Sequence, residues 1–317
     1  MNKGQRIATV SLNPAIDHTA RVSNFTAGRV NRVEWEQADA GGKGINVASF
    51  LADAGLAVVA TGLLGSANAE AFVELFARKS IADACLRLPG RTRVNVKVVD
   101  PVLDQVTDIN FRGLVPNAAD LQRLLDTVDT LCADVDWFVL SGSVPADVPS
   151  DIYADLVQRL KALGKTVVLD ASGPPLAAAV GRCPDIIKPN IDELAELVGR
   201  PLRDVADVLA AARTLADGGV GLVAVSMGAD GALFVERDAA LLALPPSVEV
   251  KSTVGAGDAM VAGIVAGTLR GLDPAERARL ATAFALGALT EVGPHLPDAD
   301  VLASLAARVR VSPLGEN

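Results

Sequence analysis

Apolar and polar positions in this chain form short apolar runs that alternate with longer amphipathic segments. The short runs predict buried strands at residues 7–11, 58–64, 137–140, 166–170, 186–188, 221–226 and 231–235. The longer segments predict helices at residues 45–54, 69–79, 118–131, 151–163, 257–270, 274–292 and 298–308. Long helices between buried strands favour an α/β fold, in which a parallel or mixed sheet is covered on both faces.

Two other parts of the chain alternate residue by residue between polar and apolar side chains. One lies within residues 22–39, and the other comprises residues 93–99 and 106–111 with a turn at Asp100 and Pro101. Such alternation is typical of strands that keep one face in water. We therefore expect one domain spanning residues 1–317, with a small β subdomain inserted from about residues 12–39 and 91–112.

The segment 252–258 (STVGAGD) is the strongest candidate for chemistry. Its two glycines lead into the apolar helix predicted after residue 257, and a glycine turn before a helix N-terminus is a ready anion site. Asp258 at this place is either an ordinary helix N-cap or the acceptor of a proton from an attacking hydroxyl. The helix N-terminus is expected to stabilise the charged form of Asp258 and so to weaken it as a base.

Three weaker motifs follow strands or open helices, where ligands of α/β sheets bind. The turn 41–44 (GGKG) precedes Asn46, and the turn 226–231 (SMGADG) joins two strands. In the third motif, Asn190 and Glu193 lie one helical turn apart. They form either a capping box or a water-mediated contact to Mg²⁺.

Composition narrows the classes of partner. A net charge of −9 and a pI near 4.8 argue against nucleic acid and anionic membrane surfaces, and 3% aromatic residues leave few stacking platforms. The three cysteines lack the spacing of a disulfide framework or a zinc site, which fits a reduced cytoplasm. With only His18 and His295 available, catalysis must depend on carboxylates, lysines, arginines and backbone amides, as phosphoryl transfer does.

The motifs together resemble the ribokinase-like (PfkB) sugar kinases along almost the whole chain. The matching segments are residues 11–17 (SLNPAID), 41–48 (GGKGINVA), 188–190 (KPN) and 252–258, in the family's order. The resemblance implies a three-layer α/β/α sandwich whose inserted strands form a β-sheet lid over the sugar.

The resemblance also implies roles for individual residues. Asp258 would be the catalytic base, and Gly255, Ala256 and Gly257 would form the anion hole for the transferred phosphate. The sugar hydroxyls would be bound by Asp17, Gly42 and Asn46, and the phosphate of the sugar by Lys43, Arg93 and Ser141. The ATP and metal side would consist of Lys188, Asn190, Glu193, Ser226, Gly228, Gly231 and Thr253.

Segments 90–97 (GRTRVNVK) and 106–111 (VTDINF) are most similar to family members that phosphorylate the C6 hydroxyl of fructose 1-phosphate. Kinases of tagatose 6-phosphate or fructose 6-phosphate are the near alternative, and a non-catalytic regulator responsive to sugar phosphates or nucleotides is the distant one. The resemblance implies ATP and Mg²⁺ as cofactors, with a K⁺ site near Ser252, Val254 and Gly293. Apolar side chains on the lid (Val33, Trp35, Val94 and Val96) predict a homodimer joined through the lids.

Overall fold

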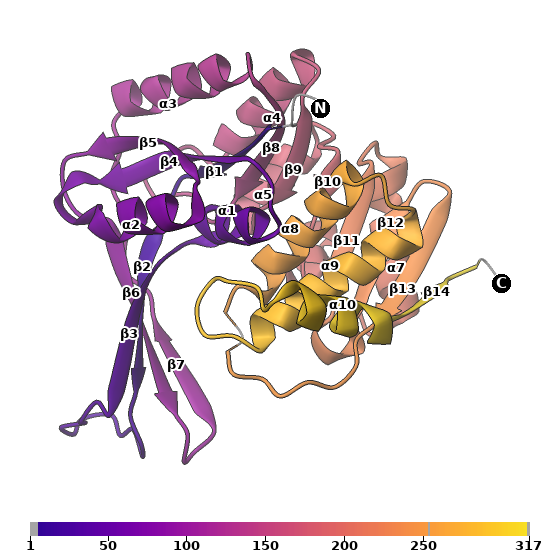
Figure 1. Ribbon diagram of the computed structural model, residues 1–317. Helices are drawn as coiled ribbons and strands as arrows, with labels where there is room; N and C mark the ends of the chain where they lie inside the picture. The colour runs from indigo at the N-terminus through magenta and orange to yellow at the C-terminus, as the bar shows by residue number, and fades with distance from the viewer. Residues whose placement is uncertain (1–5, 253, 316–317) are drawn as a thin grey trace.

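The computed structural model describes residues 6–252 and 254–315, and two sheets organise them (Figure 1). The larger sheet has the strand order β14 (Arg310–Pro313), β13 (Ala239–Leu244), β12 (Ala232–Glu236), β11 (Leu222–Ser226), β10 (Ile186–Ile187), β9 (Thr166–Asp170), β8 (Val135–Ser141), β1 (Arg6–Ser11), β4 (Val58–Gly65) and β5 (Ala82–Leu88). Neighbouring strands from β5 to β11 are parallel, and those from β11 to β14 are antiparallel. The parallel part brings the carboxyl ends of its strands to one edge.

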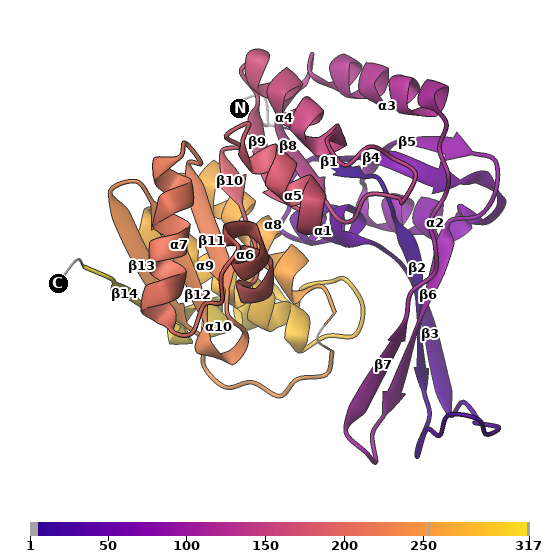
Figure 2. The same cartoon turned by 180° about the vertical axis from the view of Figure 1, so that it is seen from behind.

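Helices cover both faces of this sheet, so the predicted three-layer α/β/α sandwich is confirmed (Figures 1 and 2). One face carries α1 (Lys43–Asp53), α2 (Glu70–Lys79), α8 (Ala256–Leu269), α9 (Pro274–Leu289) and α10 (Ala299–Arg308). The other carries α3 (Ala118–Leu131), α4 (Ile152–Ala162), α5 (Gly173–Val180), α6 (Ile191–Val198) and α7 (Val205–Asp217). None of the helices in the described ranges is long and apolar enough to cross a bilayer.

The smaller sheet, called the lid sheet below, projects from the sandwich in both views (Figures 1 and 2). Its strands run in the order β3 (Trp35–Gly41), β2 (Ala15–Arg21), β6 (Arg93–Asp100) and β7 (Gln105–Ile109). Both alternating parts of the sequence contribute to it. Strand β3 begins within the segment 22–39 that was predicted to alternate, although residues 22–34 contain no strand. Strand β2 was not predicted as a strand, but it lies within the predicted bounds of the subdomain.

Strands β5, β13 and β14 were also missing from the sequence-based prediction. Strands β5 and β14 lie at the two edges of the large sheet, where fewer side chains are buried. An edge strand needs no continuous apolar run, so its signal in the sequence is weak.

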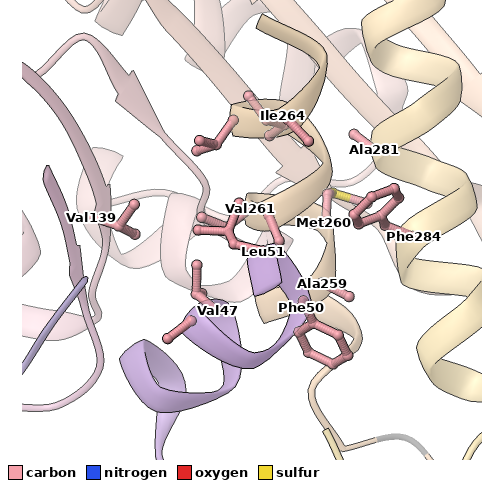
Figure 3. Close-up of a cluster of buried hydrophobic side chains, with 14 of the residues drawn as sticks. Val47, Phe50, Leu51, Val139, Ala259, Met260, Val261, Ile264, Ala281 and Phe284 are labelled. Atoms are coloured by element: carbon pink, nitrogen blue, oxygen red, sulfur yellow. The ribbon is translucent and has the colours of Figure 1, made fainter. Parts of the chain in front are cut away.

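Helices α1 and α8 pack directly against each other in the core. The close-up shows Val47, Phe50 and Leu51 of α1 against Ala259 and Val261 of α8 (Figure 3). Protein interiors are close-packed, so this contact fixes the N-terminal ends of both helices relative to each other. These two ends carry the candidate site.

Candidate functional site

A cavity of about 310 Å³ lies at the carboxyl edge of the large sheet, beside the base of the lid sheet. It is lined by the ends of β1 and β8 and by the N-termini of α1 and α8. The side chains and backbone predicted to bind the sugar phosphate all line it: Asp17, Gly42, Lys43, Asn46, Arg93 and Ser141. Gly255 and Asp258 line it as well, so residues far apart in sequence meet here as the motifs implied.

A second, larger cavity of about 570 Å³ opens on the other side of the α8 N-terminus. Ser226, Gly228 and Gly231 line it together with Ala256 and Gly257. Its remaining wall is mostly apolar and comes from residues 245–250, α8 and α9. Residues 255–258 therefore separate a polar cavity from a more apolar one.

Asp258 is the third residue of α8 and is buried. The N-cap is Gly255, with φ of 80° in the left-handed region that favours glycine, and no side chain caps this helix end. The simple interpretation of Asp258 as an N-cap is therefore wrong. Its Oδ2 instead accepts a hydrogen bond from Nδ2 of Asn46 at 2.8 Å.

Burial raises the pKa of Asp258 from 3.8 to about 7, and the nearby Asp170 carboxylate adds to the rise. The ammonium groups of Lys43 and Lys188 and the hydrogen bond from Asn46 act in the opposite direction. The carboxyl is therefore less acidic than expected, because the loss of hydration on burial outweighs the two ammonium groups and the hydrogen bond that favour its charged form. Asp258 can thus accept a proton near neutral pH.

Asp170 is a buried carboxylate that the sequence analysis missed. Its Oδ1 lies 3.1 Å from Nζ of Lys43 and 3.5 Å from Nζ of Lys188. Burial alone would raise the pKa of Asp170, but the two ammonium groups outweigh it and lower the pKa. The available signal was its place as the last residue of a predicted strand, at the edge where ligands of such sheets bind.

Arg93 presents a positive charge that has no carboxylate at ion-pair distance among the described residues, 6–252 and 254–315. Its guanidinium donates to the backbone oxygens of Asn13 at 3.1 Å and of Pro14 and Phe111 at 3.4 Å. Burial lowers the pKa of Arg93, although Asp17 is near enough to act in the opposite direction and raise it. Lys43, by contrast, already faces Asp170 and, at 3.8 Å, Glu193.

Several buried polar atoms of the first cavity have no hydrogen-bond partner in the described chain. They are Ser11 Oγ, Asn13 Oδ1, Asn95 Oδ1 and Ser141 Oγ, and all four residues line the cavity. Since buried polar groups are nearly always paired, these atoms favour a ligand rich in hydroxyl groups.

The residues expected to bind the nucleotide and the metal do not all line one cavity. Asn190 and Glu193 form a capping box, in which each side chain accepts from the other's backbone N–H, so the structural alternative is confirmed. Glu193 also lines the first cavity. Lys188 and Asn190 line neither cavity, although the Lys188 ammonium lies 3.3 Å from where a Cβ on Gly257 would be. Thr253 lies outside the described residues.

This fold, with a helix N-terminus between a sugar-sized polar cavity and a larger apolar groove, is that of a carbohydrate kinase. The model of the pfkB family carbohydrate kinases matches residues 7–300, and the chain belongs to that family. It is 54% identical to 1-phosphofructokinase of Rhodobacter capsulatus over 98% of both chains.

Two solved structures are similar over nearly the whole chain. One is described as a possible 1-phosphofructokinase of Thermotoga maritima, with a TM-score of 0.89 and 28% identity over 98% of this chain and 100% of that one. The other is phosphofructokinase-2 of Escherichia coli in complex with fructose-6-phosphate, with a TM-score of 0.86 and 27% identity over 96% of this chain and 98% of that one.

Proposed function

We propose that this chain transfers the γ-phosphoryl group of ATP to the C6 hydroxyl of fructose 1-phosphate, forming fructose 1,6-bisphosphate. The observation that carries the proposal is the N-terminus of α8, which lies between the two cavities with Asp258 on the polar side. The full-length similarity to a 1-phosphofructokinase supports this substrate over the 6-phosphates of fructose and tagatose.

The sugar phosphate occupies the first cavity in this proposal. Arg93 binds the phosphate that does not react, because its guanidinium lines the cavity and has no ion-pair partner in the described chain. Lys43 contributes less, since Asp170 and Glu193 already balance its charge. Asp17, Asn46 and the backbone of Gly42 bind the hydroxyl groups. Ser141, whose Oγ otherwise lacks a partner, binds the phosphate together with Arg93.

Asp258 orients the attacking hydroxyl and accepts its proton. The first N–H groups of α8 have no partner inside the helix, so the backbone of Gly255, Ala256 and Gly257 is suited to stabilise the negative charge of the transferred phosphoryl group. In a loose transition state the hydroxyl loses its proton late, and a carboxylate with a pKa near neutrality is sufficient.

The second cavity is the proposed nucleotide site. Ser226, Gly228 and Gly231 allow close approach to the backbone, and the apolar wall suits the base. The Lys188 ammonium lies near Gly257 at the N-terminus of α8, where the phosphates of the nucleotide would bind. Asn190 holds the start of α6 beside Ser226, with which it forms a parallel β-bridge.

In this proposal Mg²⁺ is bound mainly by the phosphates of the nucleotide. The described residues contain no group of three or more His, Cys, Asp or Glu side chains that could hold a metal. Glu193, which lines the first cavity, would contact the ion through water, with Asn190 holding Glu193 in place. The ion would neutralise charge on the phosphates. A K⁺ site near Ser252, Val254 and Gly293 stays part of the proposal.

Exposed apolar side chains on the lid sheet favour a homodimer joined through the lids. Trp35 of β3 and Val106 of β7 are 45% and 53% exposed and lie on one face of the sheet, because the register aligns them through β2 and β6. Val33, just before β3, is 52% exposed, and Ile109, on the opposite face, is 46% exposed. Val94 and Val96 are more covered than this group. A small sheet gains from covering such a face. Light scattering across working concentrations should therefore give a dimer, and a monomer at every concentration would contradict it.

The decisive experiment measures ADP release with fructose 1-phosphate, fructose 6-phosphate and tagatose 6-phosphate as acceptors. Fructose 1-phosphate should give the highest kcat/KM. A higher value for either 6-phosphate would overturn the substrate assignment. Absence of turnover with all three would instead favour a non-catalytic regulator of the same fold.

A further inference from the structure

Asn95 lines the first cavity, and although it lies within segment 90–97 no role was assigned to it from the sequence. It lies two residues after Arg93 on β6, so both side chains project from the same face of the lid sheet. Two residues of a strand span roughly 6.6 Å. A ligand group next to Asn95 is therefore a few bonds away from a group held by Arg93.

The hydrogen bonds of Asn95 fix which atom its amide can offer a ligand. Asp17 lies opposite Asn95 in the register of β2 and β6, and its Oδ1 accepts from Asn95 Nδ2 at 3.0 Å. A carboxylate accepts hydrogen bonds, so the amide nitrogen must face it. The amide oxygen Oδ1 remains, and it is buried without a partner in the described chain.

The two neighbouring positions on β6 thus prefer opposite kinds of ligand group. The guanidinium of Arg93 favours an anion. Next to Asn95 the acceptors are its own Oδ1 and the Asp17 carboxylate, while Lys97, the following side chain on this face, is already paired with Asp108 at 3.0 Å. A hydroxyl donor is therefore favoured there over a phosphate.

We propose that Asn95 is a specificity-determining residue, whose Oδ1 accepts a hydrogen bond from a ring hydroxyl of the sugar phosphate held by Arg93. This inference rests on the proposed function. A site built to pair with a hydroxyl discriminates strongly against a ligand that lacks it, because a buried polar atom is then left unpaired. Asn95 therefore helps select among phosphorylated ketoses that differ in the placing of hydroxyl and phosphate.

The first test compares wild-type protein with Asn95→Ala on the three ketose phosphates named above. For fructose 1-phosphate, KM should rise roughly 10- to 100-fold, while KM for ATP stays unchanged. The preference in kcat/KM for fructose 1-phosphate over the better 6-phosphate should shrink at least about 10-fold. Gln158→Ala removes an exposed amide side chain on α4 that lines neither cavity, and it should leave all these values unchanged.

The second test keeps the wild-type chain and changes the substrate, so it does not depend on the folding of a variant. The 3-deoxy and 4-deoxy analogues of fructose 1-phosphate are compared with the parent compound. One of them should lose at least about 10-fold in kcat/KM with the wild type, and much less with Asn95→Ala, because the two changes remove the same hydrogen bond.

The possible negative results of these experiments overturn different claims. If the wild type does not phosphorylate fructose 1-phosphate, the proposed function fails. If it does, but Asn95→Ala lowers kcat/KM equally for all three ketose phosphates, the selecting role of Asn95 is overturned. Full wild-type activity with both deoxy analogues would overturn it as well.

Discussion

Replacing Asp258 by Asn tests the site through both rate and stability. Asn keeps the shape of the side chain and can still accept the hydrogen bond from Asn46, but it cannot take a proton from the substrate. We expect kcat to fall at least about 100-fold, with little change in either KM. The wild-type kcat/KM should rise with pH around a midpoint of about 7, because the base works only when ionised.

The effect on stability follows from the same pKa. Folding raises the pKa of Asp258 from 3.8 to about 7, so the folded wild type retains a proton that the unfolded chain releases. Its stability therefore falls as pH rises through this window and stays reduced above it. A shift of about three pKa units corresponds to at most about 4 kcal/mol. Since Asn does not titrate, Asp258→Asn should be the more stable protein at pH 8, and the difference should shrink toward pH 4.

Urea denaturation at pH 5 and pH 8 measures this difference, and ADP release measures the rate. Asp238→Asn, which changes an exposed carboxylate between β12 and β13, is the matched control and should change neither quantity. A kcat within a few-fold of wild type would place the base elsewhere. A stability gain of equal size at both pH values would refute the argument from the pKa.

Three further expectations concern the residues around this base and the packing behind it. Arg93→Ala should raise KM for the sugar phosphate roughly 10- to 100-fold and leave KM for ATP unchanged; a rise confined to ATP would reverse the assignment of the two cavities. Asp170→Asn removes a negative charge near Asp258, so the midpoint of the pH–rate profile should move to lower pH, and an unchanged midpoint would contradict that coupling. Gly263→Ala should destabilise the fold by about 1–3 kcal/mol in urea, because its Cβ would lie 2.6 Å from the backbone of α9. Gly181→Ala, where the nearest atom is 3.7 Å away, should have little effect.

The central strands and the long helices could be predicted from the sequence because burial on both faces imposes continuous apolar runs. The run at β1 and the amphipathic pattern of α4 are examples, and both lie where the pattern placed them. Strand β2 carries Asp17 and His18 among its apolar residues, since it lines a cavity instead of a core. A pattern that reflects core burial could not reveal it.

Some features of the site could likewise be predicted from the sequence, and others could not. The glycine turn before α8 and the carboxylate after it are local features, so Asp258 could be identified as a candidate from neighbouring residues. Its pKa could not be predicted, because it depends on burial by the packed helices and on Asp170, which is far away in the sequence. Asn95 likewise shows its unpaired oxygen only when β2 and β6 lie side by side.

By itself, the sequence determined the layered α/β fold and the order of the motifs, and its resemblance to a known family implied which residues meet at the carboxyl edge of the sheet. Apolar periodicity and glycine turns are local properties, and a parallel sheet brings its strand ends together whatever the details. The tertiary structure alone decided how charge is distributed at that edge. It pairs Lys43 with Asp170, leaves Arg93 without an ion pair among the described residues and raises the pKa of Asp258. The physical reason is that electrostatic effects depend on distance and hydration, and packing sets both.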